Sequence, residues 1–470
     1  MLKGTEYFLN GKIKEECGVF GIFHNDNPAN FIYYGLHALQ HRGQEGVGIA
    51  TSDGKEIFRL RGEGLVTDIF NNENLETLKG NMGIGHVRYA TFGGAGIDNV
   101  QPLLIRSHMW NFVIAHNGNI VNAEELKQEL EFKGSVFQCT SDSEIIGHLI
   151  QRETGNLEER ILKALPKLEG AFSFLIMDNN NIFAIRDKNG LRPLSIAKLN
   201  GGYAISSETS AFDITGAQFI RGIEPGEVVK ISKEGLTSKK YTENTQSKMC
   251  AMEYIYFSRP DSNINSLNVH ASRRKCGSLL AKESKVDADI IIGVPDSSIS
   301  AAMGFSDETG IPYELGLIKS RYVGRTFIKP TQTLREKGVK MKLSAIESIV
   351  KGKRIVLVDD SIVRGTTSKQ IVKLLREAGA LEIHMRIASP PIISPCFYGV
   401  DTSTFEELVS SRLNVEALCK YIDADSLAFL SMDGLKKSLG ENICLACFSG
   451  EYPTPVFNLI NNLRRGENCE

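Results

Sequence analysis

Apolar and polar positions follow two different patterns in the two parts of the chain. Up to about residue 235, short apolar runs such as GVGIATS, FVIAHNGNI and GGYAISSE alternate with turn signals, and this pattern predicts strands. Helical spacing occurs between such runs, near Ala123–Phe132 and Ser143–Arg152. Strands in runs that are broken by a few helices are typical of an α+β sandwich.

The second part carries continuous apolar runs that end in polar turns, at Ala288–Ser298 and Lys353–Ser368. Such runs are typical of parallel strands buried on both faces. Helical spacing follows the second run, and its apolar positions are Ile371, Leu374, Leu375 and Ala378. Gly379 ends this helix as a C′ residue would, and Glu382–Ala388 alternates as the next strand. Strand, helix and strand make a βαβ unit, so we expect an α/β fold with a parallel sheet.

The boundary between the two parts falls in a polar segment without periodicity, Lys239–Lys248. The chain has 470 residues, which is long for a single hydrophobic core and favours two domains. We therefore expect one domain over residues 17–240 and a second over residues 250–460, with residues 1–16 as a polar leader.

Composition narrows the class of protein. A net charge of −2 gives no electrostatic reason to expect nucleic acid as a partner. No apolar run approaches the roughly 20 residues of a membrane span, and the N-terminus lacks the apolar core of a secretory signal. We therefore expect no membrane partner and a cytoplasmic protein. The nine cysteines, an odd number, argue against a disulfide framework.

Cys17 is the first candidate for chemistry, because it stands immediately before Gly18 and an apolar strand. The ordinary interpretation of such a position is a buried core cysteine. The alternative is a nucleophile that becomes the first residue once residues 1–16 are removed. A free α-amine, with a pKa of about 7.7–8.0, can then take the thiol proton without any histidine.

Three downstream positions carry groups that suit such a nucleophile. Arg88 supplies a guanidinium, which grips a carboxylate at two points. Asn117 and Gly118 supply an amide and an open backbone N–H, as in an oxyanion hole, although Asn-Gly is also a common hairpin turn. Asp142 lies in Ser-Asp-Ser-Glu, which either caps a helix or offers a carboxylate to an α-ammonium group.

In this order, the stretches CGVFGI, LQHRGQEGVGIA, HVRYATFG, AHNGNI and SDSE closely resemble the class II glutamine amidotransferase domain, an N-terminal-nucleophile hydrolase. The resemblance implies that Cys17 attacks the glutamine carboxamide and that Asn117 with Gly118 stabilises the oxyanion. It implies that Arg88 and Asp142 bind glutamine, with Arg42 as a residue that shapes the same site. It also makes residues 1–16 a propeptide that is cleaved between Glu16 and Cys17.

A second candidate site follows the apolar strand IVLV, where Asp359 and Asp360 precede Gly365–Ser368 at a predicted helix start. The carboxyl end of a strand and the N–H groups of a helix start are where α/β proteins bind phosphorylated ligands. Two carboxylates there suit ribose hydroxyls or a magnesium-bound substrate, and an acidic turn before a capped helix is the ordinary alternative. The lysine of a P-loop NTPase is absent from this sequence pattern.

This stretch resembles the phosphoribosyl-diphosphate loop of type I phosphoribosyltransferases. The resemblance implies that the ligand is bound by Asp359, Asp360, Arg364, Gly365, Thr366 and Thr367. VPDSS, at Val294–Ser298, is similar to the pyrophosphate loop of these proteins, which implies Mg²⁺ near Ser297, Asp359 and Asp360. The basic stretch Gly316–Ala345 is similar to their lid, with Arg325 and Thr326 as ligand contacts.

One family carries both halves in this order, and residues 17–455 resemble the amidophosphoribosyltransferase family, including EYIYFSRPDS and VDDSIVRGTTS. The resemblance implies transfer of ammonia from glutamine to C1 of phosphoribosyl diphosphate, the first step of purine synthesis. It implies purine nucleotides as feedback inhibitors, a homotetramer and an internal ammonia passage near Tyr89. A glucosamine-phosphate or asparagine synthetase would fit the first half alone, and a degenerate sensing protein would lack some of these residues.

Four cysteines outside the first site require their own explanation. Cys444 and Cys447 form a CxxC pair, and Cys250 and Cys396 lie far upstream. Spacing alone is compatible with either a zinc ion or a [4Fe–4S] cluster. The surrounding residues resemble the Bacillus-like branch of the family, which implies a structural [4Fe–4S] cluster on these four thiolates. The remaining cysteines are predicted to be core residues or, for the last, a tail thiol: Cys139, Cys276, Cys419 and Cys469.

Overall fold

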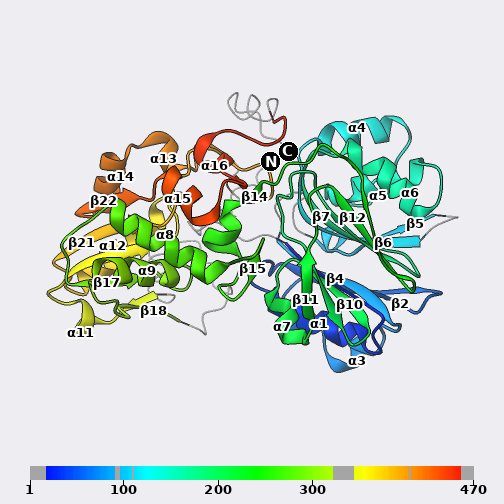
Figure 1. Cartoon of the computed structure of the whole chain (residues 1–470), viewed down its shortest axis with the longest axis horizontal. Coiled ribbons are helices and arrows are strands. Elements are labelled where there is room, and N and C mark those ends of the chain that lie inside the picture. The colour runs from blue at the N-terminus through cyan, green and yellow to red at the C-terminus, as the bar shows by residue number, and fades with distance from the viewer. Residues whose placement is uncertain are drawn as a thin grey trace, which may run out of the picture.

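The computed structural model describes residues 17–89, 96–107, 111–320, 343–400, 402 and 404–456. The predicted propeptide of residues 1–16, the predicted ligand contacts Arg325 and Thr326, and Cys469 lie outside these described residues. Figure 1 shows the two halves of the chain side by side, with the blue-to-green first half on the right and the yellow-to-red end of the chain on the left.

The first half contains two antiparallel sheets. A seven-stranded sheet has the order β11-β9-β10-β1-β4-β2-β3. Its strands are β1 (Gly18–Phe23), β2 (Gly46–Ser52), β3 (Ile57–Gly62), β4 (Met82–Arg88), β9 (Ser195–Leu199), β10 (Gly202–Ser206) and β11 (Gln218–Gly222). A six-stranded sheet has the order β13-β12-β8-β7-β6-β5. Its strands are β5 (Leu103–Arg106), β6 (Asn111–Ile120), β7 (Gly170–Met177), β8 (Ile182–Arg186), β12 (Glu227–Ser232) and β13 (Gly235–Lys240).

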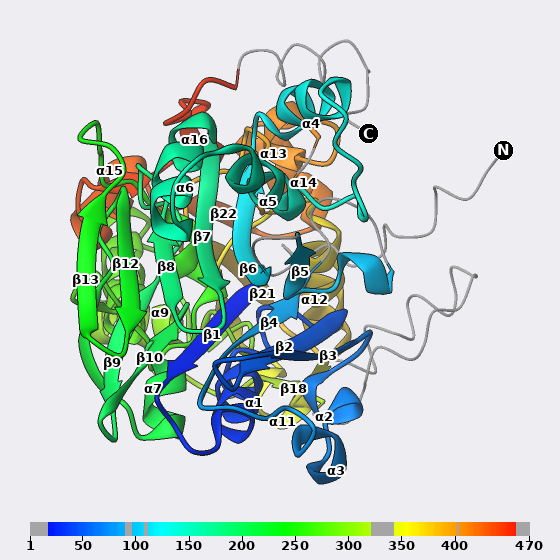
Figure 2. The ribbon, with the colours of Figure 1, turned by 90° about the vertical axis from the view of Figure 1, so that its right-hand side faces the viewer.

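Helices cover the outer face of each sheet and give four layers (Figure 2). Helices α1 (Pro28–Ala38) and α7 (Ser210–Thr215) pack on the first sheet, and α4 (Ala123–Phe132), α5 (Ser143–Arg152) and α6 (Leu157–Ala164) pack on the second. Between the sheets lies an apolar core with residues of both, among them Val19, Ile84, Val113 and Leu175. The predicted α+β sandwich is confirmed, and α4 and α5 have the predicted bounds.

The second half contains a four-stranded parallel sheet in the order β17-β20-β21-β22. Its strands are β17 (Ile290–Gly293), β20 (Arg354–Asp359), β21 (Glu382–Ile387) and β22 (Ser426–Phe429). Alternate residues of β20 face opposite cores: Val356 and Val358 pack with α8 (Val269–Glu283) and α9 (Ile299–Thr309). Ile355 and Leu357 pack with α12 (Thr366–Glu377) and α14 (Val415–Ile422). The predicted parallel α/β fold and its βαβ unit are confirmed.

Shorter elements complete the described chain. They are α2 (Val66–Ile69), α3 (Asn72–Leu75), β15 (Asn263–Ile264), β16 (Leu267–Asn268), β18 (Leu317–Lys319), β19 (Leu343–Ala345), α11 (Glu347–Val350), α13 (Val409–Arg412), α15 (Met432–Leu439) and α16 (Ala446–Ser449). Within the ranges that the structure describes, no helix has both the length and the apolar composition needed to cross a bilayer.

The connection between the halves runs along a turn of the first half. Strand β13 ends at Lys240, so it takes up the first two residues of the predicted linker. The N–H of Lys248 donates to the carbonyl of Asn189 at 2.7 Å, and that of Cys250 donates to the carbonyl of Leu191 at 3.1 Å. Strand β14 (Met249–Cys250) then pairs in parallel with β23 (Ile443–Cys444), which brings the C-terminal region back to the junction.

Candidate functional site

Cys17 lies at the open end of the first sheet, one residue before β1. Strand β1 pairs with β4 in a register that sets Gly18 opposite Val87, so the cysteine lies beside the end of β4. The backbone N–H of Tyr89 points at Cys17 Sγ at 3.5 Å, and the thiol donates to the carbonyl of Tyr89 at 3.4 Å. The thiol is half-buried at this position, so part of it remains accessible to a substrate carbonyl.

The end of β4 also positions Arg88, whose side chain is 4% exposed. The turn that precedes β2 covers its backbone, because the N–H of Glu45 donates to the Arg88 carbonyl at 3.1 Å. A Cβ on Gly43 would lie 2.6 Å from the carbonyl carbon of Arg88, so only glycine allows this close approach. Arg88 therefore lies at the end of the strand that pairs with β1, on the side of Cys17.

Asn117 and Gly118 lie near the end of β6, in the second sheet. Gly118 has a φ of +139°, and a Cβ there would lie 2.1 Å from the carbonyl oxygen of Ala171 on β7, so the position requires glycine. The Asn117 side chain is fully buried, and neither its amide nitrogen nor its amide oxygen has a hydrogen-bond partner among the described residues. Because buried polar groups are nearly always paired in folded proteins, this amide suits a ligand.

A histidine joins the two sheets close to these residues. His86 on β4 is completely buried, and its Nε2 lies 3.0 Å from the carbonyl oxygen of His116 on β6. Burial lowers the pKa of His86 to about 3, so the ring is neutral and its Nε2–H donates to that carbonyl. This bond holds the strand that ends at Arg88 against the strand that carries Asn117.

Asp142 precedes α5, and its buried carboxylate accepts hydrogen bonds from the N–H of Ile120 at 2.9 Å and the hydroxyl of Ser143 at 3.3 Å. Burial alone would raise its pKa, but His116, whose Nδ1 is 3.7 Å away, and these hydrogen bonds bring the pKa below the ordinary value. Asp142 is therefore an ionised carboxylate at the edge of the site, which suits an α-ammonium group.

Arg42 lies close to Gly18, the residue after Cys17, and its side chain contacts two buried carboxylates. It is fully buried, forms ion pairs with Glu208 and Glu253, and donates to the hydroxyl of Ser258 at 3.0 Å. Its Cδ is 3.2 Å from where a Cβ of Gly18 would be. These contacts favour a residue that shapes the site by joining it to the second half.

In the second half, the loops after β17 and β20 are cross-linked by side chains. Ser297 donates its hydroxyl to Asp360, and Ser298 donates to Asp359 at 2.9 Å. Gly365, at a φ of +73°, leads into α12, whose first residues are Thr366 and Thr367. The structure therefore gathers two carboxylates, two hydroxyls and a helix start at the carboxyl ends of the strands. Arg364 is held nearby by Glu407, with Nη2 2.8 Å from Oε1.

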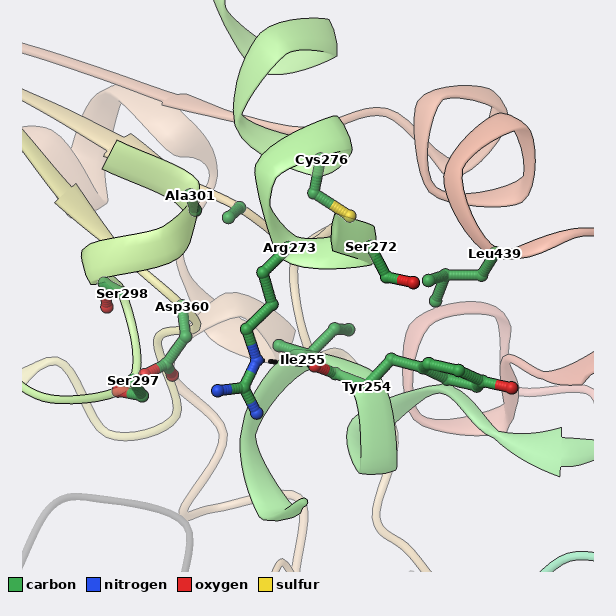
Figure 3. Close-up of a pocket in the computed structure, with 11 residues that line it drawn as sticks. Tyr254, Ile255, Ser272, Arg273, Cys276, Ser297, Ser298, Ala301, Asp360 and Leu439 are labelled. Atoms are coloured by element: carbon green, nitrogen blue, oxygen red, sulfur yellow. Dashed lines mark hydrogen bonds between the residues drawn. The ribbon is translucent and has the colours of Figure 1, made fainter. Parts of the chain in front are cut away.

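Arg273 adjoins this site and was not predicted from the sequence. Figure 3 shows its guanidinium in a pocket, facing the loops that carry Ser297 and Asp360. It donates to the carbonyls of Tyr254 at 2.7 Å and Ser258 at 2.8 Å, and burial lowers its pKa. Arg273 lies within α8, among residues with ordinary helical spacing, so no sequence motif marks it as a site residue.

The four cysteines of the predicted cluster line a single pocket. Cys250, Cys396, Cys444 and Cys447 share its walls with apolar residues and Thr402. The pKa of Cys447 lies well above its usual value because the thiol is buried and the other three lie close enough to repel its thiolate. Among the described residues, no three or more histidine, cysteine or acidic side chains are arranged to hold a single metal ion.

The sequence-predicted residues thus fall into three groups. Cys17, Arg88, Asn117, Gly118 and Asp142 surround the facing ends of the two antiparallel sheets. Ser297, Asp359, Asp360 and Gly365–Thr367 lie at the carboxyl ends of the parallel strands, and the four cysteines lie between the halves. The pocket that contains Ser297 and Asp360 has no described residue of the first group on its walls.

Comparisons with known proteins identify both halves. The profile of the glutamine amidotransferase domain matches residues 90–213, and that of the phosphoribosyl transferase domain matches residues 265–388. The amidophosphoribosyltransferase of Bacillus subtilis is 55% identical over 95% of this chain and 95% of its own length. That of Methanocaldococcus jannaschii is 49% identical over 94% of this chain and 98% of its own.

Solved structures agree with these relatives. The glutamine phosphoribosylpyrophosphate amidotransferase of Bacillus subtilis, complexed with ADP and GMP, matches with a TM-score of 0.90 at 54% identity, over 94% of this chain and 98% of that chain. A structure described as the allosteric regulatory enzyme of purine biosynthesis matches with a TM-score of 0.91 at 54% identity, over 94% of this chain and 97% of that chain. The chain therefore belongs to the amidophosphoribosyltransferase family.

Proposed function

We propose that the chain carries out the reaction of its family with two separate sites, one in each half. That reaction is the glutamine-dependent amination of phosphoribosyl diphosphate, the first step of purine biosynthesis. The observation that supports two separate sites is that the two groups of candidate residues lie in different halves of the chain. Cys17 and its neighbours lie in the antiparallel half, whereas Asp359 and Asp360 lie at the carboxyl end of a parallel strand in the other half.

In the first site, Cys17 is the nucleophile and its own α-amine is the base, so residues 1–16 must first be removed as a propeptide. The thiolate bonds to the carboxamide carbon, the C–N bond breaks, and nitrogen leaves as ammonia with the proton taken from the thiol. Water then hydrolyses the thioester to glutamate and restores the thiol. The unpaired amide of Asn117 and the N–H of Gly118 stabilise the oxyanion, and Arg88 and Asp142 bind the carboxylate and ammonium ends of glutamine.

In the second site, the residues at the carboxyl ends of β17 and β20 bind phosphoribosyl diphosphate. The oxygen donors of Ser297, Asp359 and Asp360 would hold a magnesium ion, which would supply positive charge to balance the negative charge of the pyrophosphate. The N–H groups and hydroxyls at the start of α12 bind phosphate. Ammonia attacks C1, the C1–oxygen bond breaks, and phosphoribosylamine and pyrophosphate form. Arg325 and Thr326 belong to the proposed lid.

A structural [4Fe–4S] cluster on Cys250, Cys396, Cys444 and Cys447 is part of the same proposal. Four thiols around one pocket supply the ligand set that such a cluster needs. The cluster would fasten the C-terminal region to the junction, where β14 and β23 already pair.

The remaining parts of the proposal concern regulation and assembly. A structure at 54% identity was solved with ADP and GMP, which supports purine nucleotides as feedback inhibitors of this chain. We include a cytoplasmic location and a homotetramer in the proposal, together with an internal ammonia passage between the sites that begins near Tyr89.

The test is a Cys17→Ala variant of the full chain, assayed with glutamine and with ammonium salts. Glutamine-dependent synthesis of phosphoribosylamine should vanish, and ammonia-dependent synthesis should persist, because only the second site is then needed. The N-terminal residue of the purified wild-type protein should be Cys17. Loss of both activities in a folded variant, or a wild-type chain that is active while starting at Met1, would overturn the proposal.

A further inference from the structure

The oxyanion glycine lies between backbone segments of both halves. On one side, the Ala171 carbonyl of β7 lies 2.1 Å from the position that a Cβ of Gly118 would occupy. On the other side lies Gly399, where a Cβ would be 3.5 Å from the carbonyl carbon and oxygen of Gly118. The Gly118 peptide therefore lies next to Gly399, which is 281 residues further along the chain.

Gly399 belongs to the segment Phe397–Gly399, and two side chains of the first half donate hydrogen bonds to it. Asn119, the residue after the oxyanion glycine, donates its amide Nδ2–H to the carbonyl of Phe397 at 3.0 Å. Arg192 is fully buried and donates its Nε–H to the carbonyl of Tyr398 at 3.1 Å, and its Nη2 donates to the same oxygen. The carbonyls of Phe397 and Tyr398 therefore both accept hydrogen bonds from side chains of the first half.

The other end of the segment enters the cysteine pocket. Tyr398 donates its N–H to Cys396 Sγ at 3.3 Å, and its ring is 2% exposed. One apolar cluster contains Ala171, Leu191, Tyr398, Cys444 and Ala446. Packed atoms therefore run without interruption from the cysteine pocket to the strand that backs Gly118.

We propose that Phe397–Gly399 positions the oxyanion N–H of Gly118, and that Asn119 and Arg192 are the positioning residues that hold it. The inference rests on the proposed function, since it assigns supports to a site whose role is itself proposed. An oxyanion hole stabilises charge that develops in the transition state, and its donors must be fixed before the reaction. A loosened segment therefore lowers the turnover number for glutamine more than it weakens glutamine binding, which depends on Arg88 and Asp142.

The chain offers a matched control for Asn119. Asn122 lies three residues further on, and its Nδ2–H donates to the carbonyl of Lys167 at 2.9 Å, within the first half. Asn119→Ala and Asn122→Ala thus each remove one asparagine-to-carbonyl bond of similar length, and both side chains are half-buried. Asn122→Ala also removes the bond that Oδ1 of Asn122 accepts from the N–H of Glu169 at 2.9 Å, so it is the more severe of the two changes. Only the first bond reaches the segment that covers Gly118.

We expect Asn119→Ala to lower kcat for glutamine hydrolysis by about tenfold, with KM for glutamine changed by less than about twofold. Ammonia-dependent synthesis and the visible absorption of the full-length enzyme should match those of the wild type. Asn122→Ala should leave all of these quantities at wild-type values. A rise in KM at constant kcat, or an equal loss of the two synthetic activities, would overturn the inference.

Arg192→Lys supplies a second measurement, because lysine keeps the charge and loses the fork that donates twice to Tyr398. It should lower the glutamine kcat in the same selective way, and a wild-type kcat in the folded variant would contradict the inference. Cys17→Ala distinguishes failure of the proposed function from failure of the positioning role. If Cys17→Ala retains glutaminase activity, the proposed function fails, whereas if only Asn119→Ala and Arg192→Lys retain it, the positioning role fails.

Discussion

Arg42 and Glu253 lie 211 residues apart in the chain and form a fully buried ion pair, in which Nη1 of the arginine is 3.2 Å from Oε1 of the glutamate. Ser258 completes the arrangement, since its hydroxyl donates to Glu253 at 2.7 Å and accepts from Arg42 at 3.0 Å. Arg42 belongs to the turn before β2 and Glu253 to a π-helical segment, Glu253–Phe257. The pair therefore joins the nucleophile's half to the ribose-phosphate half.

Arg42→Met should strongly destabilise the protein. The change leaves the carboxylates of Glu208 and Glu253 buried without their main partner, which typically costs about 3–5 kcal/mol. Urea-induced unfolding of the two proteins would measure the difference. Arg274→Met is the control, because Arg274 pairs with Asp307 at an exposed position and should change the midpoint little. Equal midpoints for Arg42→Met and wild type would show that the buried pair contributes nothing net.

The carboxylate of Glu208 makes this stability depend on pH. Burial alone would raise its pKa, but Arg42 and His41 hold the pKa well below the ordinary value of 4.5. The groups facing it are His41, Arg42, the N–H of Arg259 and the hydroxyl of Ser262. Because the folded-state pKa is depressed, the contribution to stability is complete above pH 4.5 and is lost as the pH falls through the folded-state value.

Glu208→Gln isolates this contribution, because glutamine has a similar shape and does not titrate. The free energy of unfolding should be lower in the variant at about pH 7, and the gap between variant and wild type should narrow steadily below about pH 4.5. Unfolding in urea across this range checks the sign. A gap that widens on acidification would mean that Glu208 is protonated in the folded protein.

Gly118→Ala should abolish glutamine-dependent activity while ammonia-dependent activity persists. A methyl group would meet the Ala171 carbonyl oxygen at 2.1 Å, so β6 must shift and the oxyanion N–H moves with it. Loss of one such donor typically lowers kcat by about 10²–10³-fold. Gly134→Ala is the matched control, because it also has a positive φ, of +84°, but no heavy atom lies within 4 Å of the added Cβ. Wild-type glutaminase activity in Gly118→Ala would show that the N–H of Gly118 does not stabilise the oxyanion.

Local pattern predicted many of the elements, whereas the candidate site residues were predicted from the family resemblance, because each of them alone fits an ordinary structural role. Apolar spacing predicted the bounds of α4 and α5 and the β20–α12–β21 unit, in which Gly379, with φ +89°, follows the end of α12. Contacts between distant segments could not be predicted in this way. Neither the Arg42–Glu253 pair nor the placement of Arg273 beside Asp360 leaves a periodic or local signal, because each depends on how segments distant in the chain pack together.

The cysteine pocket gives two predictions, and the first concerns the iron content of the protein. Cys444→Ser should remove most of the iron and acid-labile sulfide from protein purified without oxygen, and with them the visible absorption, because the buried hydroxyl replaces a thiolate ligand. Cys419→Ser is the control. Cys419 lies on α14 outside the pocket, and its thiol donates to the carbonyl of Ala424 at 3.2 Å.

The same pocket predicts how metal loading depends on pH. Burial raises the pKa of the Cys444 thiol to about 12, and burial and the neighbouring sulfurs raise the pKa of Cys447 well above its usual value. In the metal-free protein these two thiols are therefore protonated at neutral pH, and they must release protons when the cluster assembles. Reconstitution with iron and sulfide should accordingly proceed further as the pH rises, and protons should be released in proportion to the iron bound. Zinc in place of iron in the wild-type protein, or full iron content in Cys444→Ser, would exclude a [4Fe–4S] cluster on these four cysteines.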